Sequence, residues 1–317
     1  MTWLVTGGAG YIGAHVVRAF AADGIDVVVI DDLSSGKPEF LLDGVPFVEA
    51  NLLDTDTVRK TLAGVSGVVH LAGYKYAGVS VEKPMHTYTQ NVSAMVSLLN
   101  AMADTGVRNI VFSSSAGVYG TPEDEVVTEQ TKPDPQSPYG ETKLVGEWLL
   151  ADQAKAVELH HTSLRYFNVV GSGDPKVYDA SPYNLFPIVC NLLTQGKVPQ
   201  IYGTDHPTPD GTSVKDYVHV ADLARAHVAA ARALDSGKTL EPVYNLGSGT
   251  GTSVRQIMDA ARRVTGIDFT PGEAPRRPGD PSRVVASGEL AARDLEWKNT
   301  HTVDEMFASA WESWPRS

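Results

Sequence analysis

The feature that most constrains the fold is a strand, a glycine-rich turn, a helix and a second strand, which follow one another without a break near the start of the chain. Residues 3–6 are a short strand-like run, and residues 15–22 have the pattern of a helix. Between them, four glycines fit both Gly-x-Gly-x-x-Gly and Gly-x-x-Gly-x-x-Gly, namely Gly7, Gly8, Gly10 and Gly13. Such glycines let the backbone approach a pyrophosphate at a helix N-terminus, where free N–H groups and the helix dipole favour anions. The unit therefore predicts a dinucleotide site.

The second strand of this unit ends in two acidic residues. Residues 26–31 form a continuous apolar run between aspartates, as expected of a parallel strand that is covered on both faces. Asp31 closes the run and Asp32 follows it. A carboxylate at this point accepts hydrogen bonds from an adenosine ribose and repels a 2′-phosphate. The pair therefore favours NAD over NADP as the cofactor.

Strands and helices continue to alternate through the first half of the chain. We predict strands at 46–49, 67–71, 109–112 and 161–165, and helices at 55–63, at 84–104 and around Tyr139. This order predicts an α/β fold with a doubly wound parallel sheet of the Rossmann type and right-handed crossovers. Ligands of such sheets bind beyond the carboxyl ends of the strands. Four residues fall at those ends and are treated as a site: Gly73, Lys75, Ser115 and Asn168.

The character of the chain changes after Gly171. Residues 171–215 are rich in Pro, Gly, Asp and Thr and contain one predicted helix, around 184–195. We expect a dinucleotide-binding domain over residues 1–170, whose sheet also receives 214–247, and a smaller substrate-binding region mainly over 171–317. The remaining predicted elements are helices at 222–234, 253–264, 287–295 and 303–313, a strand at 243–246 and an irregular loop at 271–280.

Tyr139 and Lys143 lie four residues apart, just after Pro138. If a helix begins there, both side chains lie on one face, about one turn apart. A tyrosine with the ordinary pKa of about 10 is a poor base at neutral pH, but an ammonium group beside the phenol favours the phenolate and lowers that pKa. The spacing therefore predicts a proton-transfer pair.

Composition argues against several classes of partner. The 317 residues carry a formal net charge of −12 without a run of lysine or arginine, which argues against a nucleic-acid face or an anionic membrane surface. No apolar run reaches the roughly 18 residues of a membrane-spanning helix, and we expect no secretory signal. The single cysteine, Cys190, fits a reducing compartment, so we expect a cytoplasmic protein. The histidines show no metal-ligand spacing, and we expect no metal.

Eight stretches carry a further pattern when they are taken in order: residues 5–13, 112–120, 136–143, 164–168, 210–212, 216–220, 244–247 and 274–277. Together they resemble the extended short-chain dehydrogenase/reductases, and most closely the family of UDP-galactose (UDP-glucose) 4-epimerases, over nearly the whole length. The resemblance implies an NAD-dependent enzyme that oxidises a UDP-hexose at C4 to a 4-keto sugar and reduces it again, and so interconverts UDP-glucose and UDP-galactose. It also implies a homodimer formed by paired helices, and residues 171–317 as the UDP-sugar-binding region.

The resemblance assigns roles to the positions that match the family's motifs. The catalytic residues that it implies are Ser115, Tyr139 and Lys143. Together with Tyr139 and Lys143, the implied NAD contacts are Gly7, Gly10, Tyr11, Ile12, Gly13, Asp31, Asp32, Asn51, Leu52, Leu71, Ala72, Gly73, Lys75, Asn91 and Phe167. Together with Ser115, the implied UDP-hexose contacts are Tyr166, Asn168, Asn184, Leu185, Gln200, Tyr202, Lys215, Arg277 and Asp280.

Three positions depart from the pattern of the family that the chain resembles. Asn51 stands where an aspartate is usual, and we expect its amide oxygen to keep the adenine contact. Lys215 stands for an arginine and keeps the charge without the bidentate fork. Val284 falls where some epimerases have a tyrosine beside the sugar. The smaller side chain predicts room for a 2-N-acetyl group, and hence UDP-GlcNAc and UDP-GalNAc as further substrates.

Alternatives within and outside this family stay open. The dehydratases that the chain resembles place an Asp-Glu pair beside the active-site serine or threonine, where this chain has Ala116 and Gly117. This argues against a 4,6-dehydratase. A decarboxylase or a uronate 4-epimerase needs a cation for the sugar carboxylate, which the loop around 171–180 could supply. A non-catalytic NAD-sensing module is a different class, but such modules can lose the tyrosine and lysine that this chain keeps.

Overall fold

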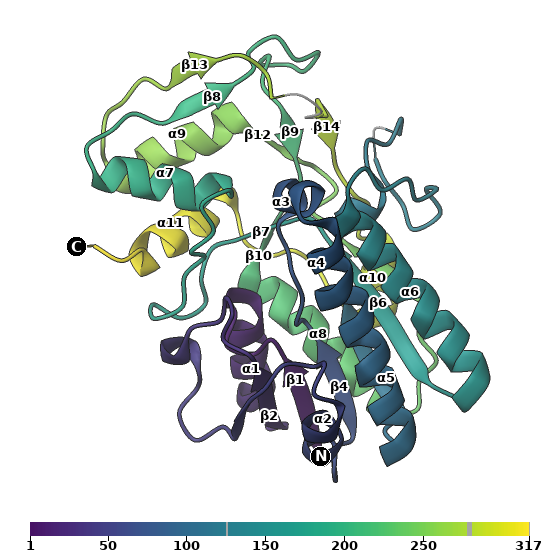
Figure 1. Ribbon diagram of the computed structural model, residues 1–317. Coiled ribbons are helices and arrows are strands. Elements are labelled where there is room, and N and C mark those ends of the chain that lie inside the picture. Colours follow the sequence, from purple (N-terminus) through teal and green to yellow (C-terminus); the bar gives the residue numbers. More distant parts are fainter. Residues whose placement is uncertain (125, 278–280, 317) are drawn as a thin grey trace.

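A seven-stranded parallel sheet forms the centre of the computed structural model, which describes residues 1–124, 126–277 and 281–316 (Figure 1). The strand order is β11-β6-β5-β4-β1-β2-β3. The strands span β1 (Thr2–Thr6), β2 (Asp26–Asp31), β3 (Phe47–Glu49), β4 (Gly67–His70), β5 (Asn109–Ser113), β6 (His160–Tyr166) and β11 (Val243–Leu246). The predicted doubly wound α/β fold is confirmed.

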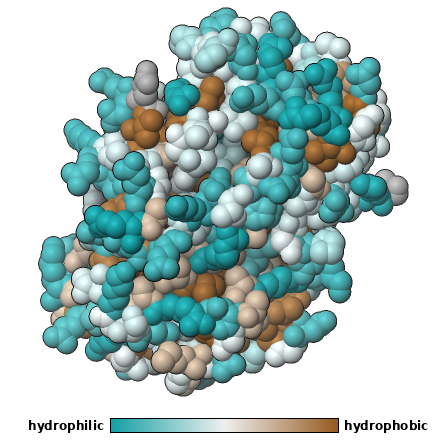
Figure 2. Space-filling view, turned by 180° about the vertical axis from the view of Figure 1, so that it is seen from behind, coloured by the Kyte–Doolittle hydropathy of each residue, from teal (hydrophilic) through white to brown (hydrophobic). Residues whose placement is uncertain are grey.

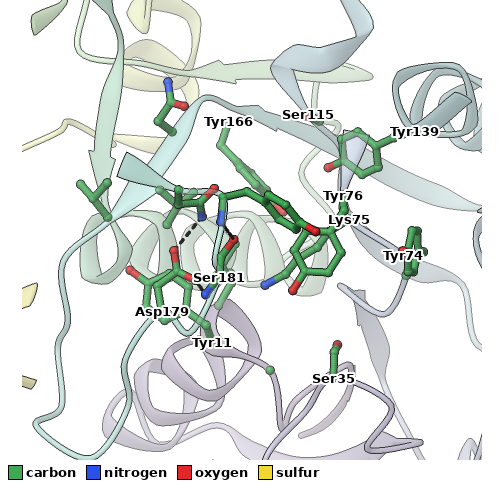
Figure 3. A pocket seen from close by; sticks show the side chains of 18 of the residues that line it. Tyr11, Ser35, Tyr74, Lys75, Tyr76, Ser115, Tyr139, Tyr166, Asp179 and Ser181 are labelled. Atoms are coloured by element: carbon green, nitrogen blue, oxygen red, sulfur yellow. Dashed lines mark hydrogen bonds between the residues drawn. The ribbon is translucent and has the colours of Figure 1, made fainter. Parts of the chain in front are cut away.

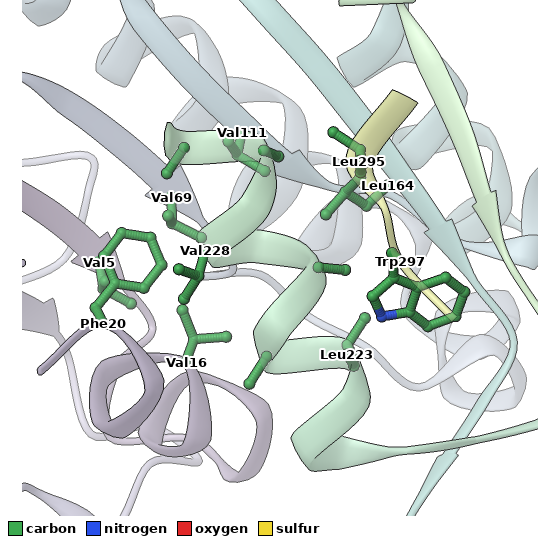
Figure 4. Close-up of a cluster of buried hydrophobic side chains, with 14 of the residues drawn as sticks. Val5, Val16, Phe20, Val69, Val111, Leu164, Leu223, Val228, Leu295 and Trp297 are labelled. Atoms are coloured by element: carbon green, nitrogen blue, oxygen red, sulfur yellow. The ribbon is translucent and has the colours of Figure 1, made fainter. Parts of the chain in front are cut away.

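Helices cover both faces of this sheet. Two of them, α1 (Tyr11–Ala22) and α8 (Val220–Asp235), share one hydrophobic cluster with the strands (Figure 4). The other face carries α2 (Thr55–Thr61), α5 (Ala94–Thr105) and α6 (Pro138–Val157). The second strand is buried against both layers, which explains why its sequence is a continuous apolar run rather than an alternating one.

The side chains of β1 pack alternately in the hydrophobic clusters on the two faces of the sheet. Trp3 and Val5 pack in the cluster of α1 and α8, whereas Leu4 between them packs in the cluster of α2, α5 and α6. Successive side chains of a strand point to opposite faces of a sheet, so this division follows from the backbone alone. The three side chains are fully buried and contribute roughly 1.5–3 kcal/mol each to the free energy of unfolding by burial of apolar surface.

The single helix predicted at 84–104 is interrupted in the structure. The chain runs through α4 (Pro84–Tyr88), a π-helical segment (Thr89–Ser93) and α5. The wider π turn carries Asn91, whose buried side chain accepts the N–H of Tyr74 at 2.6 Å and donates to the Thr142 hydroxyl at 2.8 Å. Apolar periodicity predicted the helical residues on either side of this turn, but not the extra residue within it. Such π turns are frequent at functional sites.

A smaller region lies at the carboxyl ends of the main strands (Figure 1). Its helices α7 (Leu185–Thr194), α9 (Val254–Thr265) and α11 (Val303–Ser313) share one hydrophobic cluster. Short strands frame it in pairs or threes: β7 (Asn168–Val170) with β10 (Tyr217–His219), β8 (Gln200–Tyr202) with β13 (Gly272–Ala274), and β9 (Val214–Lys215) with β12 (Thr252–Ser253) and β14 (Arg283–Val284). Two further helices are α3 (Ala77–Glu82) and α10 (Glu289–Leu295).

Two sequence expectations for this region are corrected by the topology. Of residues 214–247, the strand β11 joins the main sheet, but β9 and β10 pair elsewhere. The loop expected to be irregular at 271–280 contains β13, and residues 278–280 lie outside the part of the chain that the structure describes. Strands of two or three residues are too short to show a period of two, so the sequence pattern could not reveal them.

Residues 171–178 form a strap across α1, a name we keep below. The Tyr11 hydroxyl donates to the Gly171 carbonyl at 2.6 Å, and the Gly173 N–H donates to Nε2 of His15 at 2.9 Å. One helical turn further on, an ion pair of 2.6 Å joins Arg18 and Asp174. The strap therefore binds the segment that leads into the smaller region to the helix that follows the glycine turn.

On the surface, hydrophobic side chains form small separate patches among polar ones on the face seen in Figure 2. Among the residues that the structure describes, no helix combines the length and the apolar character that a membrane span requires.

Candidate active site

One large cavity, of about 1050 Å³, lies at the carboxyl ends of the main strands and reaches into the smaller region (Figure 3). Apart from Asn91, every predicted site residue that the structure describes lines it. Asn91 instead holds the backbone of the loop after β4 through its hydrogen bonds to Tyr74. Asp280 lies outside the described residues. The fold thus brings together residues that the sequence separates by up to 270 positions, from Gly7 to Arg277.

The glycine turn is packed too tightly for side chains. Gly7 has a φ of +73°, and a Cβ there would lie 2.7 Å from the backbone nitrogen of Ala72. A Cβ on Gly13 would lie 2.0 Å from the Gly7 carbonyl oxygen. The absence of side chains leaves backbone exposed to the cavity where α1 begins, and a helix N-terminus with free N–H groups suits a pyrophosphate. This cradle fits the dinucleotide that the sequence predicts.

The two aspartates after the second strand have different tasks. Asp31 accepts the N–H groups of Ala9 at 3.0 Å and Leu33 at 2.9 Å, so it braces the glycine turn, and burial raises its pKa. Although partial burial opposes it, hydrogen bonds from Ser34 and Asn51 lower the pKa of Asp32 on balance. A charged carboxylate at the cavity wall suits a ribose diol and disfavours a phosphate.

The amide group of Asn51 is already engaged. Its Nδ2 donates to Asp32 at 2.7 Å, and its Oδ1 accepts the N–H of Leu53 at 3.0 Å. We expected this oxygen to meet the adenine, and that contact stays a prediction.

The helix α6 begins where the proton-transfer pair requires it. Ser137 caps the helix by accepting the N–H of Gly140 at 3.3 Å, and Pro138 occupies the first turn. Tyr139 and Lys143 then lie one turn apart and both line the cavity. Ser115 follows β5 and lines the same cavity, and its hydroxyl lowers the pKa of Tyr139 against the effect of burial. The structure therefore assembles the three predicted catalytic side chains around one point of the cavity.

One expectation about this pair is wrong for the structure. We predicted that Lys143 lowers the pKa of Tyr139, whereas burial raises it, and the Ser115 hydroxyl offsets part of that rise. The Nζ atom of Lys143 donates to the Ser113 carbonyl at 2.8 Å and lies 5.8 Å from the centroid of the Tyr139 ring. Burial also lowers the pKa of Lys143 to about 8, against the charge of Glu147.

Glu147 is a residue that our sequence reasoning missed. It lies one turn beyond Lys143 on the same face of α6, is buried, and pairs with Arg165 through bonds of 2.8 and 2.5 Å. It also accepts the Ser114 hydroxyl at 2.6 Å. The spacing of four residues from Tyr139 to Lys143 to Glu147 was a signal that could have identified it.

The wall of the cavity that the smaller region forms carries the two predicted cations. The Arg277 guanidinium lies over the Tyr202 ring at 4.2 Å, and Nζ of Lys215 donates to the Pro281 carbonyl at 2.6 Å. Asn184 donates to Asp179 at 2.7 Å, and Asn168 donates to the Asp216 carbonyl at 2.8 Å. These contacts hold both amides in place at the wall.

Aromatic residues that we did not predict form part of the same wall. Tyr76 lies before α3 and Tyr183 before α7, and their rings meet edge to face at 5.2 Å. Tyr74 continues this row at 5.8 Å from Tyr76. All three lie in loops, where no periodic pattern marks them. Val284, by contrast, packs toward the cluster around Val118 and is absent from the described lining of the cavity, so the reason we gave for an enlarged sugar site is not supported.

Comparison with known proteins relates this geometry to a family. The model of the NAD dependent epimerase/dehydratase family matches residues 3–247. The chain is 41% identical to the UDP-glucose 4-epimerase of Lactobacillus helveticus, over 100% of this chain and 98% of that protein. It also resembles the structure of UDP-glucose 4-epimerase from Brucella ovis in complex with NAD (TM-score 0.94, 37% identity, 98% and 97% of the two chains). A third similar structure is the UDP-Glc/GlcNAc 4-epimerase of Campylobacter jejuni (TM-score 0.86, 32% identity, 98% of each chain).

Proposed function

The chain belongs to the NAD dependent epimerase/dehydratase family, and from this premise we propose that it is an NAD-dependent isomerase that interconverts UDP-glucose and UDP-galactose. The observation that carries the proposal is the convergence of Ser115, Tyr139 and Lys143 on a cavity that also contains the glycine turn. Full-length similarity to UDP-glucose 4-epimerases supports the substrate.

The residues that would hold NAD follow from the geometry of the wall. The glycine turn would bind the pyrophosphate and Asp32 the adenosine ribose. Bound NAD would supply the hydride chemistry, and the protein would supply orientation and charge.

Tyr139 moves the proton. Ser115 accepts the N–H of Gly117 at 3.0 Å, which leaves its own hydroxyl proton free to point at the Tyr139 oxygen. A donated hydrogen bond favours the phenolate, so Tyr139 can take the proton of the sugar 4-hydroxyl as C4 is oxidised and return it after the sugar has turned. Lys143 adds a positive charge at the same site.

The UDP group remains bound while the 4-keto sugar turns over. Arg277 and Lys215, which both line the cavity, would supply the charges for the diphosphate. Anchoring at one end keeps C4 within reach on either face, which is the positioning that the rate requires.

Incubation of purified, NAD-loaded protein with UDP-galactose tests this proposal directly. We expect UDP-glucose to form until the two nucleotide sugars reach equilibrium. Chromatography measures the amount of each. A protein that is folded and holds NAD but leaves UDP-galactose unchanged would overturn it.

A second pair of substrates, UDP-GlcNAc and UDP-GalNAc, is supported by the similar protein of Campylobacter jejuni, which is named as a UDP-Glc/GlcNAc 4-epimerase. A panel of UDP-hexoses, UDP-N-acetylhexosamines and UDP-hexuronates tests this extension. Turnover of hexuronates in preference to hexoses would favour the uronate 4-epimerase or decarboxylase alternative instead.

We also propose a cytoplasmic homodimer. Val96 on α5 and Trp148 on α6 are exposed on neighbouring helices, with 40% and 59% of their surface accessible, and would be covered by the same two helices of a second copy. The thiol of Cys190 is free and buried, which suits a reducing compartment.

A further inference from the structure

We propose that Glu147 is a positioning residue, which through the Ser114 hydroxyl fastens the end of β5 to α6. This contact fixes Ser115 and the Ser113 carbonyl, which lie on either side of Ser114 and meet the proton-transfer pair of α6. The role in catalysis rests on the proposed function, but one of the two measurements below requires neither substrate nor turnover.

The pairing of β5 within the main sheet ends just before this contact. Ser113 lies opposite Leu164 at the last position of the register with β6, so Ser114 lies beyond both registers that β5 makes. Its fully buried side chain donates to Oε1 of Glu147 at 2.6 Å, because a carboxylate oxygen can only accept. The hydrogen bond to α6 therefore holds the chain at the point where the strand leaves the sheet.

Glu147 is itself held in one orientation by Arg165. The Nε of Arg165 donates to Oε1 at 2.8 Å, and a terminal guanidinium nitrogen donates to Oε2 at 2.5 Å. The same guanidinium donates to the Tyr119 hydroxyl at 2.8 Å, which donates to Asn245 at 2.7 Å. All of these side chains are buried. Because a bidentate guanidinium fixes the plane of a carboxylate, Glu147 offers Ser114 an acceptor in a defined position.

A second contact with α6 lies on the other side of Ser115. Gly117 packs so closely on the first turn of α6 that a Cβ on Gly140 would lie 2.4 Å from the Gly117 carbonyl oxygen. A Cβ on Gly117 would lie 3.3 Å from Oγ of Ser115 and 3.6 Å from Cε1 of Tyr139, and Figure 3 shows both side chains at the same end of the cavity. Ser115 is thus held between two contacts with the helix that carries Tyr139.

The contact at Ser114 also places the carbonyl group of its neighbour Ser113. Nζ of Lys143 donates to this carbonyl at 2.8 Å, and an acceptor of this kind favours the charged ammonium. Burial lowers the pKa of Lys143 to about 8, and the charge of Glu147 limits that fall. Glu147 therefore acts on Lys143 in two ways, through the position of a carbonyl and through its own charge.

Nuclear magnetic resonance of protein with 13C-labelled lysine tests this arrangement without substrate. The signal of Lys143, assigned by its loss in Lys143→Arg, is followed as the pH is raised. We expect Lys143 in Ser114→Ala to titrate roughly 0.5–1 pH unit lower than in wild type, as the loss of one hydrogen bond gives. Glu147→Ala should lower the pKa further, because the charge is lost as well. Ser163→Ala, which removes a buried hydroxyl of β6 without a partner in the described part of the chain, should leave it unchanged.

Kinetics with UDP-galactose test the consequence for the reaction. We expect Ser114→Ala to lower kcat at least about 10-fold with KM near the wild-type value, because the proton-transfer groups are misaligned while the contacts to UDP remain. Ser114→Thr keeps the hydroxyl and should recover most of the loss. Since Glu147 acts on Ser115 through Ser114, adding Ser114→Ala to Glu147→Ala should lower kcat no further.

Circular dichroism identifies the variants that fold and can be compared. If Ser114→Ala is folded and keeps both the wild-type kcat and the wild-type pKa of Lys143, the proposal fails. It fails as well if Ser163→Ala shows the same losses, since any lost hydroxyl in the sheet would then suffice. A wild type without turnover contradicts the proposed function instead, and the order of the Lys143 pKa values still decides the role of Glu147.

Discussion

At the scale of single residues, the direction of a hydrogen bond decides what Tyr139 can do. Its phenol is buried and its pKa is raised, which alone would make it a poor base. Ser115 accepts the N–H of Gly117, so its own hydroxyl proton stays available for donation to the phenol oxygen. The sequence predicted which three residues meet, but not how their protons are arranged, because that depends on backbone groups that no side-chain pattern encodes.

Tyr139→Phe tests this assignment. Because the phenol oxygen is the group that accepts the sugar proton, we expect kcat for UDP-galactose to fall at least about 100-fold, the low end for general acid–base catalysis. Bound NAD, measured by its absorbance after release, should stay near the wild-type amount. Tyr88→Phe, on α4 and outside the described lining of the cavity, is the matched control and should keep its activity. Full activity in Tyr139→Phe would remove Tyr139 from the mechanism.

At the scale of the element, α6 carries both the proposed catalytic pair and a buried ion pair with β6. Its cap at Ser137 and its proline at 138 were readable from the sequence, and so was the spacing of Tyr139 and Lys143. The buried pair of Glu147 and Arg165 was not, because Arg165 lies in β6 and only the folded sheet brings it under α6. The π turn at Asn91 escaped prediction for a similar reason, since its partners Tyr74 and Thr142 are distant in sequence.

Glu147→Ala should destabilise the protein strongly. It leaves the Arg165 guanidinium buried without its carboxylate, which costs roughly 3–5 kcal/mol in the free energy of unfolding. Urea unfolding followed by circular dichroism measures this change. Asp104→Ala removes one of the two carboxylate partners of Arg59 at an exposed site, where we expect little loss of stability. Equal losses in the two variants would contradict the structural role of Glu147.

At the scale of the whole molecule, burial of histidines makes the fold sensitive to acid. Burial lowers the pKa of four of them to about 3 or 4: His15, His70, His219 and His227. Between these values and the ordinary pKa of about 6.5, the unfolded chain binds more protons than the folded one, so stability is lost as pH falls through this range.

Thermal unfolding at pH 7.5 and pH 5.5 measures this effect. We expect a lower Tm at pH 5.5, with each of the four histidines contributing roughly 1 kcal/mol of the loss. His227→Gln should reduce the difference between the two pH values, whereas His160→Gln, at an exposed position, should leave it unchanged. A Tm that rises on acidification would contradict the assignment of neutral buried rings.

The proposed homodimer makes a separate prediction at this scale. Trp148→Arg places a charge in the surface that two copies of α5 and α6 would bury, and we expect it to give monomers in sedimentation velocity experiments where the wild type gives dimers. Ile267→Arg changes an exposed apolar residue just beyond α9 and should leave the assembly intact. A wild type that sediments as a monomer would rule out the dimer.

The outline of the main sheet was predictable because most of its strands are runs of four to seven residues, and the covering helices impose a helical period on the sequence. The smaller region was predicted as helices between loops, because its strands of two or three residues have no readable period. Within the cavity, residues at strand ends were predictable from the topology rule, whereas the tyrosines at 74, 76 and 183 lie in loops whose course depends on the packing of distant segments.

The last strand of the main sheet has a consequence for modularity. β11 and α8 come from residues 220–246, after the chain has built much of the smaller region, and α8 closes the core over β1, β4 and β5. A gene fragment cut at residue 170 would encode the nucleotide cradle and α1, yet it would lack α8, β11 and the strap. The chain segments of the main sheet and of the smaller region therefore alternate along the sequence. A simple gene fusion could not transfer either part, complete, to another protein.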